Sequence, residues 1–115
     1  MLRGEIRLVD LDPAMGAEAN KRRPAVIVSN DRANATAAKL GRGVVTVVPV
    51  TSSVARVYPF QVALASVESG LRVDSKAEAE QVRSVSVERV GPVLGRVPTA
   101  LMAALDDALR LHLHL

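Results

Sequence analysis

Residues 22–30, Arg-Arg-Pro-Ala-Val-Ile-Val-Ser-Asn, decide the fold. The β-branched apolar run at their centre predicts a buried strand, and the polar residues at the end of the stretch stop it. Pro24 restricts Arg23 to an extended backbone, so the Arg23 guanidinium lies at the start of a rigid strand. Basic residues at a strand end usually form only a solvated face. The rest of the chain favours a functional role for Arg23.

Composition predicts one compact domain over residues 1–115. Apolar residues make up 49% of the chain and charged residues 23%, which supports a core of Val, Leu and Ala. The net charge is +3 and the sequence pI is about 10.0, so a polyanion such as nucleic acid suits as a partner. The absence of cysteine excludes disulfides and thiolate metal sites. We see no signal peptide and no membrane-spanning stretch, and we expect a cytoplasmic protein.

Several short strands are expected along the chain. Alternation or continuous apolar runs predict them at residues 4–10, 23–30, 43–51, 60–65 and 90–97. Pro49 lacks an N–H and implies a bulge or an edge near the end of its strand. The pattern favours a mainly β fold with helices (α+β), in which a small, mostly antiparallel, barrel-like sheet carries packed helices.

Two helices are expected beside these strands. Asn30 or Asp31 caps a short helix over residues 32–40, and Gly41 closes it. A longer helix follows Pro98, with Thr99 as its N-cap. Its apolar face is formed by residues at helical spacing, namely Leu101, Leu105, Ala108, Leu109 and His112.

An acid, an arginine and a hydroxyl are the candidate reactive groups. Glu18 lies five residues before Arg23, and Thr51 ends the second apolar strand. If the two apolar strands are neighbours, Arg23 and Thr51 share one end of the sheet. Such a set suits cleavage of an RNA phosphodiester by the RNA's own 2′-hydroxyl, which needs donors for the developing charge and some proton transfer, but no metal. No metal motif is present, because His112 and His114 point in different directions on a helix.

Short motifs cover almost the whole chain. They are Gly4-Glu5-Ile6, Val9-Asp10-Leu11-Asp12-Pro13, Gly16-Ala17-Glu18, Arg23-Pro24-Ala25-Val26-Ile27-Val28-Ser29, Val48-Pro49-Val50-Thr51-Ser52, Tyr58-Pro59-Phe60-Gln61-Val62 and Glu80-Gln81-Val82-Arg83-Ser84-Val85. In this order they resemble the MazF/PemK family of toxin endoribonucleases. Each motif is short, and together they are specific.

The resemblance implies an SH3-like barrel of the CcdB/MazF type with a C-terminal helix, assembled as a homodimer. It implies sequence-specific cleavage of single-stranded RNA without a metal or other cofactor, leaving a 2′,3′-cyclic phosphate and a 5′-hydroxyl. It also implies inhibition of growth, and neutralisation by a cognate antitoxin whose acidic, flexible tail covers the RNA groove.

The resemblance also carries residue roles. By position, Arg23 and Thr51 match the family's catalytic arginine and threonine, and Glu18 matches an acidic residue of the first loop. Arginine is a poor base, because a guanidinium in water stays protonated at neutral pH. We therefore assign charge stabilisation and proton donation to Arg23, a hydrogen bond to a phosphate oxygen to Thr51, and the role of base to Glu18. Contacts with RNA are expected from Lys21, Arg22, Ser52, Gln81, a polar strand residue, and Arg83.

Arg7 departs from the family, which commonly carries Trp at this position. The change is either tolerated on a half-exposed strand or alters packing by the first loop, RNA preference or toxicity. Two other functions stay open: a non-catalytic module that binds RNA or protein, and a gyrase-poisoning toxin on the same fold. The Arg23-Pro24 and Pro49-Val50-Thr51-Ser52 motifs favour the nuclease.

Overall fold

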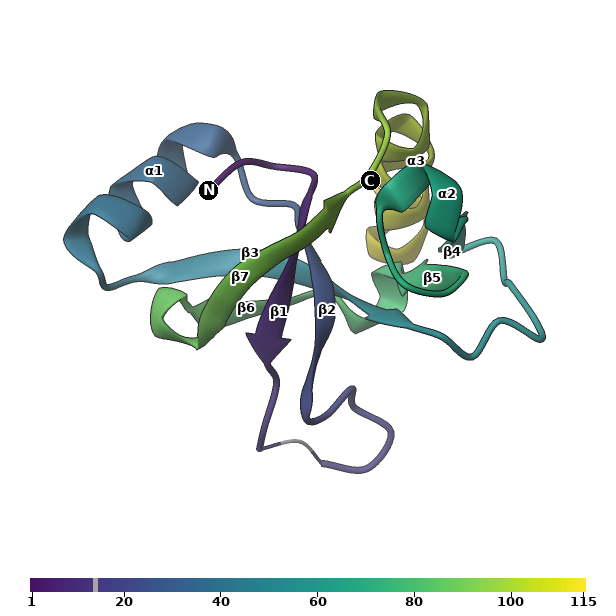
Figure 1. Ribbon diagram of the computed structural model, residues 1–115, viewed down its shortest axis with the longest axis horizontal. Helices are drawn as coiled ribbons and strands as arrows, with labels where there is room; N and C mark the ends of the chain where they lie inside the picture. The colour runs from purple at the N-terminus through teal and green to yellow at the C-terminus, as the bar shows by residue number, and fades with distance from the viewer. Residues whose placement is uncertain (14) are drawn as a thin grey trace.

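The computed structural model describes residues 1–13 and 15–115. Within these residues there are seven strands, β1 (Glu5–Asp10), β2 (Arg22–Ile27), β3 (Val44–Thr51), β4 (Gln61–Leu64), β5 (Ser75–Glu78), β6 (Arg83–Ser86) and β7 (Val90–Arg96). The helices are α1 (Asp31–Leu40), α2 (Ser66–Ser69) and α3 (Thr99–Leu113), with short 3-10 turns η1 (Ala79–Gln81) and η2 (Val87–Arg89). Figure 1 shows the strands crossing at the centre of the molecule, with α1 and α3 at opposite sides.

The strands form an antiparallel sheet in the order β4-β5-β3-β2-β1-β7, and β6 adds to β3. β3 is the centre of this sheet, because β2 pairs along one side of it and β6 and then β5 pair along the other. On that second side, β6 is last paired at Val47 and β5 is first paired at Val50. Pro49 lies in the gap, so the ladder is interrupted where the missing N–H predicts it. The predicted α+β class is confirmed.

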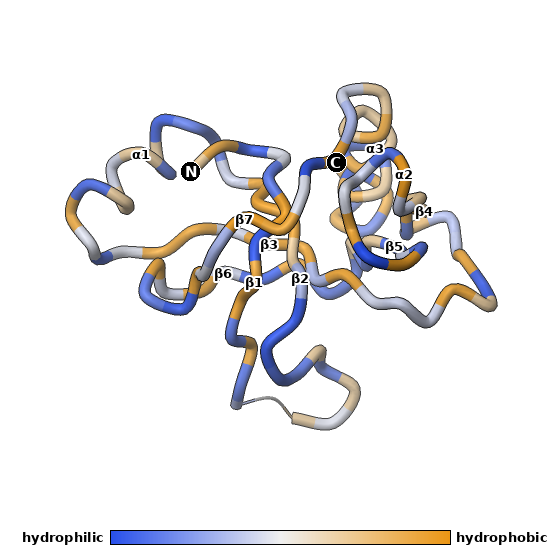
Figure 2. Tube along the Cα trace, in the orientation of Figure 1, coloured by the Kyte–Doolittle hydropathy of each residue, from blue (hydrophilic) through white to orange (hydrophobic). Residues whose placement is uncertain are grey.

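Two hydrophobic clusters lie on the two faces of the sheet, because alternate residues of a strand point to opposite faces. One cluster packs against α3 and includes Val26, Val48 and Leu105. The other packs against α1 and includes Ala25, Ile27, Val45, Val47 and Ala37. Figure 2 shows hydrophobic colour along the central strands, while the stretch leading into β2 is hydrophilic.

β2 ends at Ile27, three residues before the predicted end of the strand. The next residues serve α1 instead. The Asn30 Oδ1 accepts a hydrogen bond from the Ala33 N–H at 2.9 Å, and the Asn34 side chain donates to the Ser29 carbonyl at 2.8 Å. Asn30 is therefore the N-cap, and Gly41 closes the helix in the left-handed conformation, as predicted.

α3 begins one residue earlier than a cap at Thr99 requires. Pro98 occupies the N-cap position, and its carbonyl accepts from the N–H groups of Leu101 and Met102. Thr99 is the first helical residue, because Pro98, with its extended backbone, is the last residue before the helix and serves as its N-cap. His112, expected on the apolar face, is exposed with the rest of the last turn. Within residues 1–13 and 15–115, no helix is long and apolar enough to cross a membrane.

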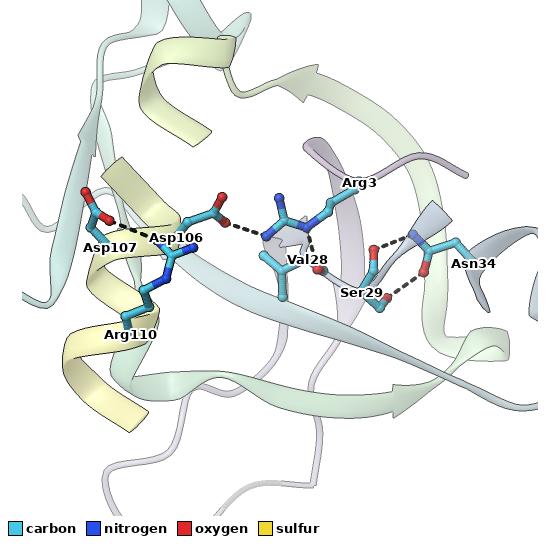
Figure 3. Close-up of polar contacts among 7 residues, drawn as sticks. All are labelled: Arg3, Val28, Ser29, Asn34, Asp106, Asp107 and Arg110. Carbon is cyan, nitrogen blue, oxygen red and sulfur yellow. Dashed lines mark hydrogen bonds and ion pairs between the residues drawn. The ribbon is translucent and has the colours of Figure 1, made fainter. Parts of the chain in front are cut away.

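Arg3 ties the N-terminal segment to the rest of the sheet (Figure 3). Its Nε donates to the Val28 carbonyl at 2.7 Å, and its Nη2 forms an ion pair with Asp106 of α3 at 2.5 Å. One side chain thus connects the start of the chain, the end of β2 and the last helix. This contact fixes α3 over the face of the sheet opposite α1.

Candidate active site

The two apolar strands β2 and β3 are neighbours, as the site prediction requires. Ala25 is the cross-strand partner of Pro49, and continuing this antiparallel register by two residues sets Arg23 beside Thr51. Both residues also line one cavity of about 410 Å³ at this end of the sheet. The same cavity is lined by the predicted RNA-contacting residues Lys21, Arg22 and Ser52, and by Arg72. Four basic residues therefore meet around one hydroxyl-bearing strand end.

Arg23 is held by the residues just before it. Its Nε donates to the Asn20 carbonyl at 2.8 Å, and its Nη2 donates to the Asn20 Oδ1 at 3.2 Å. These two bonds fix one edge of the guanidinium and the plane of the fork. The remaining N–H donors suit the paired oxygens of a phosphate, since a guanidinium has five donors in a fixed plane.

Thr51 is half-buried at the end of β3. Its Oγ1 accepts a hydrogen bond from the Ser53 N–H at 3.2 Å, so the hydroxyl does bond the local backbone. Accepting this bond leaves the hydroxyl proton available, because a threonine hydroxyl carries one donor and two acceptor lone pairs. The Ser53 N–H thus orients an oxygen that can still donate to a ligand.

Lys76, Glu78 and Gln61 extend this site across β5 and β4. Lys76 is the cross-strand partner of Thr51, and Gln61 is that of Glu78. Residues paired across strands share a face, and residues two apart in a strand do so too. Arg23, Thr51, Lys76, Glu78 and Gln61 therefore lie on one face, which we call the site face. The alternation of charged residues and alanine in residues 76–80 is a sequence pattern that could have indicated this face, but no site was predicted from it.

Glu78 is a titratable group of the site face, and its pKa is raised. Burial raises the pKa of Glu78 above its ordinary value, and the neighbouring Glu80 carboxylate raises it further. The charges of Lys76 and Arg23 act in the opposite direction on this pKa but do not cancel the rise. Glu78 therefore lies within electrostatic reach of Arg23, and the sequence analysis did not identify it.

Glu18 and Gln81 organise the β1–β2 loop. The Glu18 Oε1 accepts from the Met15 N–H at 2.9 Å, and Glu18 is not among the residues that line the 410 Å³ cavity. Gln81 lies in η1 and not in a strand as expected, because the chain turns after β5. Its side chain accepts from the Ala19 N–H and donates to the Ala17 carbonyl, both at 3.0 Å. This amide fastens the loop that carries Glu18.

Arg83 and Arg7 each have a contact at the edge of this region. Arg83 donates to the carbonyl of Leu11 at 3.2 Å, so it too supports the β1–β2 loop. Arg7 lies 3.6 Å from the Glu5 carboxylate, and its buried Nε has no hydrogen-bond partner within the part of the chain that the structure describes. In the same part, no three His, Asp or Glu side chains gather in a way that could hold a metal ion.

The comparisons with known proteins agree on one family. The model of the PemK-like, MazF-like toxins of type II toxin-antitoxin systems matches residues 2–113. This chain belongs to that toxin family. It is 65% identical over its full length to the endoribonuclease MazF9 of Mycobacterium tuberculosis, covering 98% of that protein. It is also 39% identical to the endoribonuclease PemK of Escherichia coli over 89% of the chain and 74% of the relative.

Solved structures show the same fold. MazF of Deinococcus radiodurans superposes with a TM-score of 0.80 at 27% identity, covering 100% of this chain and 97% of the other. A mycobacterial endoribonuclease in complex with its cognate antitoxin superposes with a TM-score of 0.76 at 25% identity, covering 100% and 96%. The predicted family, the MazF-type fold and the class of endoribonuclease toxins are confirmed.

Proposed function

We propose that residues 1–115 form one toxin domain that cleaves single-stranded RNA at specific sequences without a metal ion. The products are a 2′,3′-cyclic phosphate and a 5′-hydroxyl, and the cleavage inhibits growth from within the cytoplasm. The observation that carries this proposal is the meeting of Arg23 and Thr51 at the shared end of β2 and β3, in a cavity lined by further cations. Such a site attracts a phosphodiester and stabilises charge that develops on it.

The reaction moves the 2′-hydroxyl oxygen of the RNA onto the adjacent phosphorus and breaks the bond to the 5′-oxygen. Arg23 clamps two phosphate oxygens and supplies a proton toward the leaving oxygen. The Thr51 hydroxyl donates a hydrogen bond to a phosphate oxygen. Both groups are held before RNA arrives, by Asn20 and by the Ser53 N–H respectively, so little reorganisation is needed in the transition state.

A base must accept the proton of the 2′-hydroxyl, and two carboxylates compete for this role. Glu18 is the residue that the family resemblance implies. Glu78 lies on the site face with Arg23, and its raised pKa brings it nearer to the operating pH of a general base. The pH dependence of cleavage by Glu18→Gln and Glu78→Gln separates them. The variant that lacks the base loses the acidic limb of the profile, while the other keeps it.

The partners that we propose are single-stranded RNA, a second copy of this chain and a cognate antitoxin with an acidic, flexible tail. The cationic cavity suits both polyanions, so the tail and the RNA are expected to compete. A homodimer is supported by β7, an end strand of the sheet whose Val93 and Leu94 side chains are 52% and 38% exposed. Light scattering at micromolar concentration tests the dimer, and a monomer that cuts RNA contradicts it.

Incubation of the purified protein with mixed RNA in excess chelator tests the activity. We expect discrete new ends, with a 5′-hydroxyl on one fragment and a cyclic phosphate on the other. Sequencing of these ends gives the shortest oligonucleotide that is cleaved. An intact RNA pool with retained binding would instead support a binding module, and an intact pool with inhibited gyrase would support the protein-directed toxin.

A further inference from the structure

The only tyrosine and the only phenylalanine of the chain stack on each other. The ring centroids of Tyr58 and Phe60 are 5.3 Å apart, and their planes differ by 3°. Phe60 is half-buried, but Tyr58 is 41% exposed. A chain with no tryptophan thus places its whole aromatic content in one exposed loop, between β3 and β4.

Two cations flank the Tyr58 ring. The Arg56 guanidinium carbon lies 5.7 Å from the ring centroid, and the Lys76 Nζ lies 5.8 Å from it. A guanidinium is planar and stacks on aromatic rings, as a nucleobase does. Arg56 is exposed, and its side-chain contact to the Tyr58 hydroxyl is long, at 3.4 Å. It can therefore move aside for a flat base and cover that base from the other side.

Buried polar groups hold this loop in place. The Tyr58 N–H donates to the Gln61 Oε1 at 3.1 Å, and the Tyr58 carbonyl accepts from the Gln61 N–H at 2.9 Å. The Lys76 Nζ donates to the Arg56 carbonyl at 2.6 Å. Gln61 and Lys76 are both only 8% exposed. The backbone that carries Tyr58 is therefore held by buried side chains, while the ring itself is accessible to solvent. A pre-ordered platform lowers the entropic cost of binding.

The stacked rings of Tyr58 and Phe60 lie next to the proposed reaction centre. Lys76, whose Nζ lies 5.8 Å from the Tyr58 ring centroid and donates to the Arg56 carbonyl, is the cross-strand partner of Thr51. The distance from Thr51 to the Tyr58 ring is thus spanned by one lysine side chain. An RNA strand whose phosphate sits between Arg23 and Thr51 passes this ring with a nearby nucleotide.

We propose that Tyr58, backed by Phe60 and bordered by Arg56, is a stacking subsite for one unpaired nucleobase near the scissile phosphate. This inference rests on the proposed RNA cleavage and adds the subsite that positions the strand. Proteins bind single-stranded RNA by stacking splayed bases on aromatic rings and guanidinium planes. The subsite recognises the flat face of a base, so it contributes affinity and register more than base identity.

The test uses the shortest RNA oligonucleotide that the wild type cleaves, made non-cleavable by a 2′-deoxy group at the scissile position. A series of these oligonucleotides carries an abasic nucleotide at one position at a time. Affinity is measured for wild type, Tyr58→Phe, Tyr58→Leu and the control Val54→Ala, which changes an exposed apolar residue of the same loop. Thermal melting of each variant reports any loss of the fold.

We expect one position at which removal of the base weakens binding to wild type and Tyr58→Phe by about 5- to 150-fold. At that position the abasic change has no further effect on Tyr58→Leu, because the base has lost its stacking partner. Val54→Ala behaves as wild type. Equal abasic penalties for wild type and Tyr58→Leu at every position would overturn the subsite, while cleavage by the wild type would still support the proposed function.

A second measurement needs no variant. The protein has one tyrosine and no tryptophan, so its ultraviolet emission reports Tyr58 alone. The intact non-cleavable oligonucleotide is expected to quench this emission more than the oligonucleotide that is abasic at the critical position, with free tyrosine correcting for absorbed light. Equal quenching by both RNAs at saturation overturns the subsite. A wild type that neither binds nor cleaves RNA overturns the subsite and the proposed function together.

Discussion

The two faces of strands β2, β3 and β5 use the same backbone for different purposes. Toward α3 they present Val26, Val48, Val50 and Ala77, which are all at most 2% exposed. On the other face, at the ends of the same strands, they present Arg23, Thr51, Lys76 and Glu78. The side-chain period of two places neighbouring residues, such as Val50 and Thr51, on opposite faces. Stability and chemistry are therefore separated by one residue along the chain.

This difference teaches that the reactive groups are rigid because the opposite face is packed. Apolar burial against α3 fixes the strands, and the strands fix the positions of Arg23 and Thr51. Short polar contacts then orient the side chains, through Asn20 and the Ser53 N–H. Substitutions on the face toward α3 are expected to change stability, and those of Arg23 and Thr51 to change activity.

Arg23→Lys is the substitution on the site face with the largest expected effect on cleavage. Lysine keeps the charge but loses the planar two-point fork, so we expect single-turnover cleavage to fall on the order of 10³-fold. RNA affinity weakens only mildly, because several other cations contribute to it. Arg42→Lys, in the exposed turn between α1 and β3, is the matched control and cleaves as wild type. A lysine variant that cuts within about threefold of wild type would make Arg23 an ordinary member of a basic patch.

Val48→Ala and Thr51→Ala sharpen the comparison within one strand. Thr51→Ala is expected to lower cleavage on the order of 10²-fold and stability by at most about 1 kcal/mol. Val48→Ala removes a fully buried side chain and is expected to cost about 2–3 kcal/mol of unfolding free energy, with cleavage per folded molecule unchanged. Denaturant unfolding and single-turnover kinetics check both. Parallel losses of fold and activity in Thr51→Ala would assign Thr51 a structural role only.

Sequence reasoning placed Arg23 and Thr51 together because each follows from local signals. Pro24 and the apolar run define one strand end, and Thr51 ends the next apolar run. Their proximity required only that two strands consecutive in the sequence pair with each other, which is the commonest arrangement in a sheet. The caps of α1 could also be predicted from the sequence, because Asn30 and Gly41 act on backbone groups close to them in the chain.

The rest of the site depends on contacts between distant parts of the chain. Lys76 and Glu78 join it through the register of β5 on β3, and no short turn sets this register because β4 and α2 lie between the two strands in the chain. The contact of Gln81 with RNA stays a prediction, and its amide bonds to Ala17 and Ala19, more than sixty residues earlier, could not be read from the sequence. Thr99 was displaced from the cap of α3 because Pro98 already supplies the turn.

Two Arg–Asp pairs at α3 test how its contact with the sheet is held (Figure 3). Arg3 bonds both Asp106 and the Val28 carbonyl and is part-buried, so we expect Arg3→Ala to cost about 1–2 kcal/mol of unfolding free energy. The pair of Arg110 and Asp107 lies on one helix, with side chains 61% and 78% exposed. Arg110→Ala is therefore expected to cost at most about 0.5 kcal/mol. Equal losses in denaturant unfolding would remove the special role of Arg3.

Glu78→Gln has the smallest expected effect on stability, and this effect depends on pH. Burial and the Glu80 carboxylate raise the pKa of Glu78 above its unfolded value of 4.5, so the folded protein binds this proton more tightly than the unfolded chain does. The stability that this group contributes is fully present below pH 4.5 and is lost as the pH rises through the raised folded pKa. Glutamine does not ionise, so Glu78→Gln is expected to become more stable relative to wild type across that window and to hold the gain at neutral pH. Unfolding by denaturant from pH 4 to pH 8 measures the difference, with Glu88→Gln, at an exposed position, as the control. A difference between Glu78→Gln and wild type that does not change with pH would show that the carboxylate feels no net penalty on the site face.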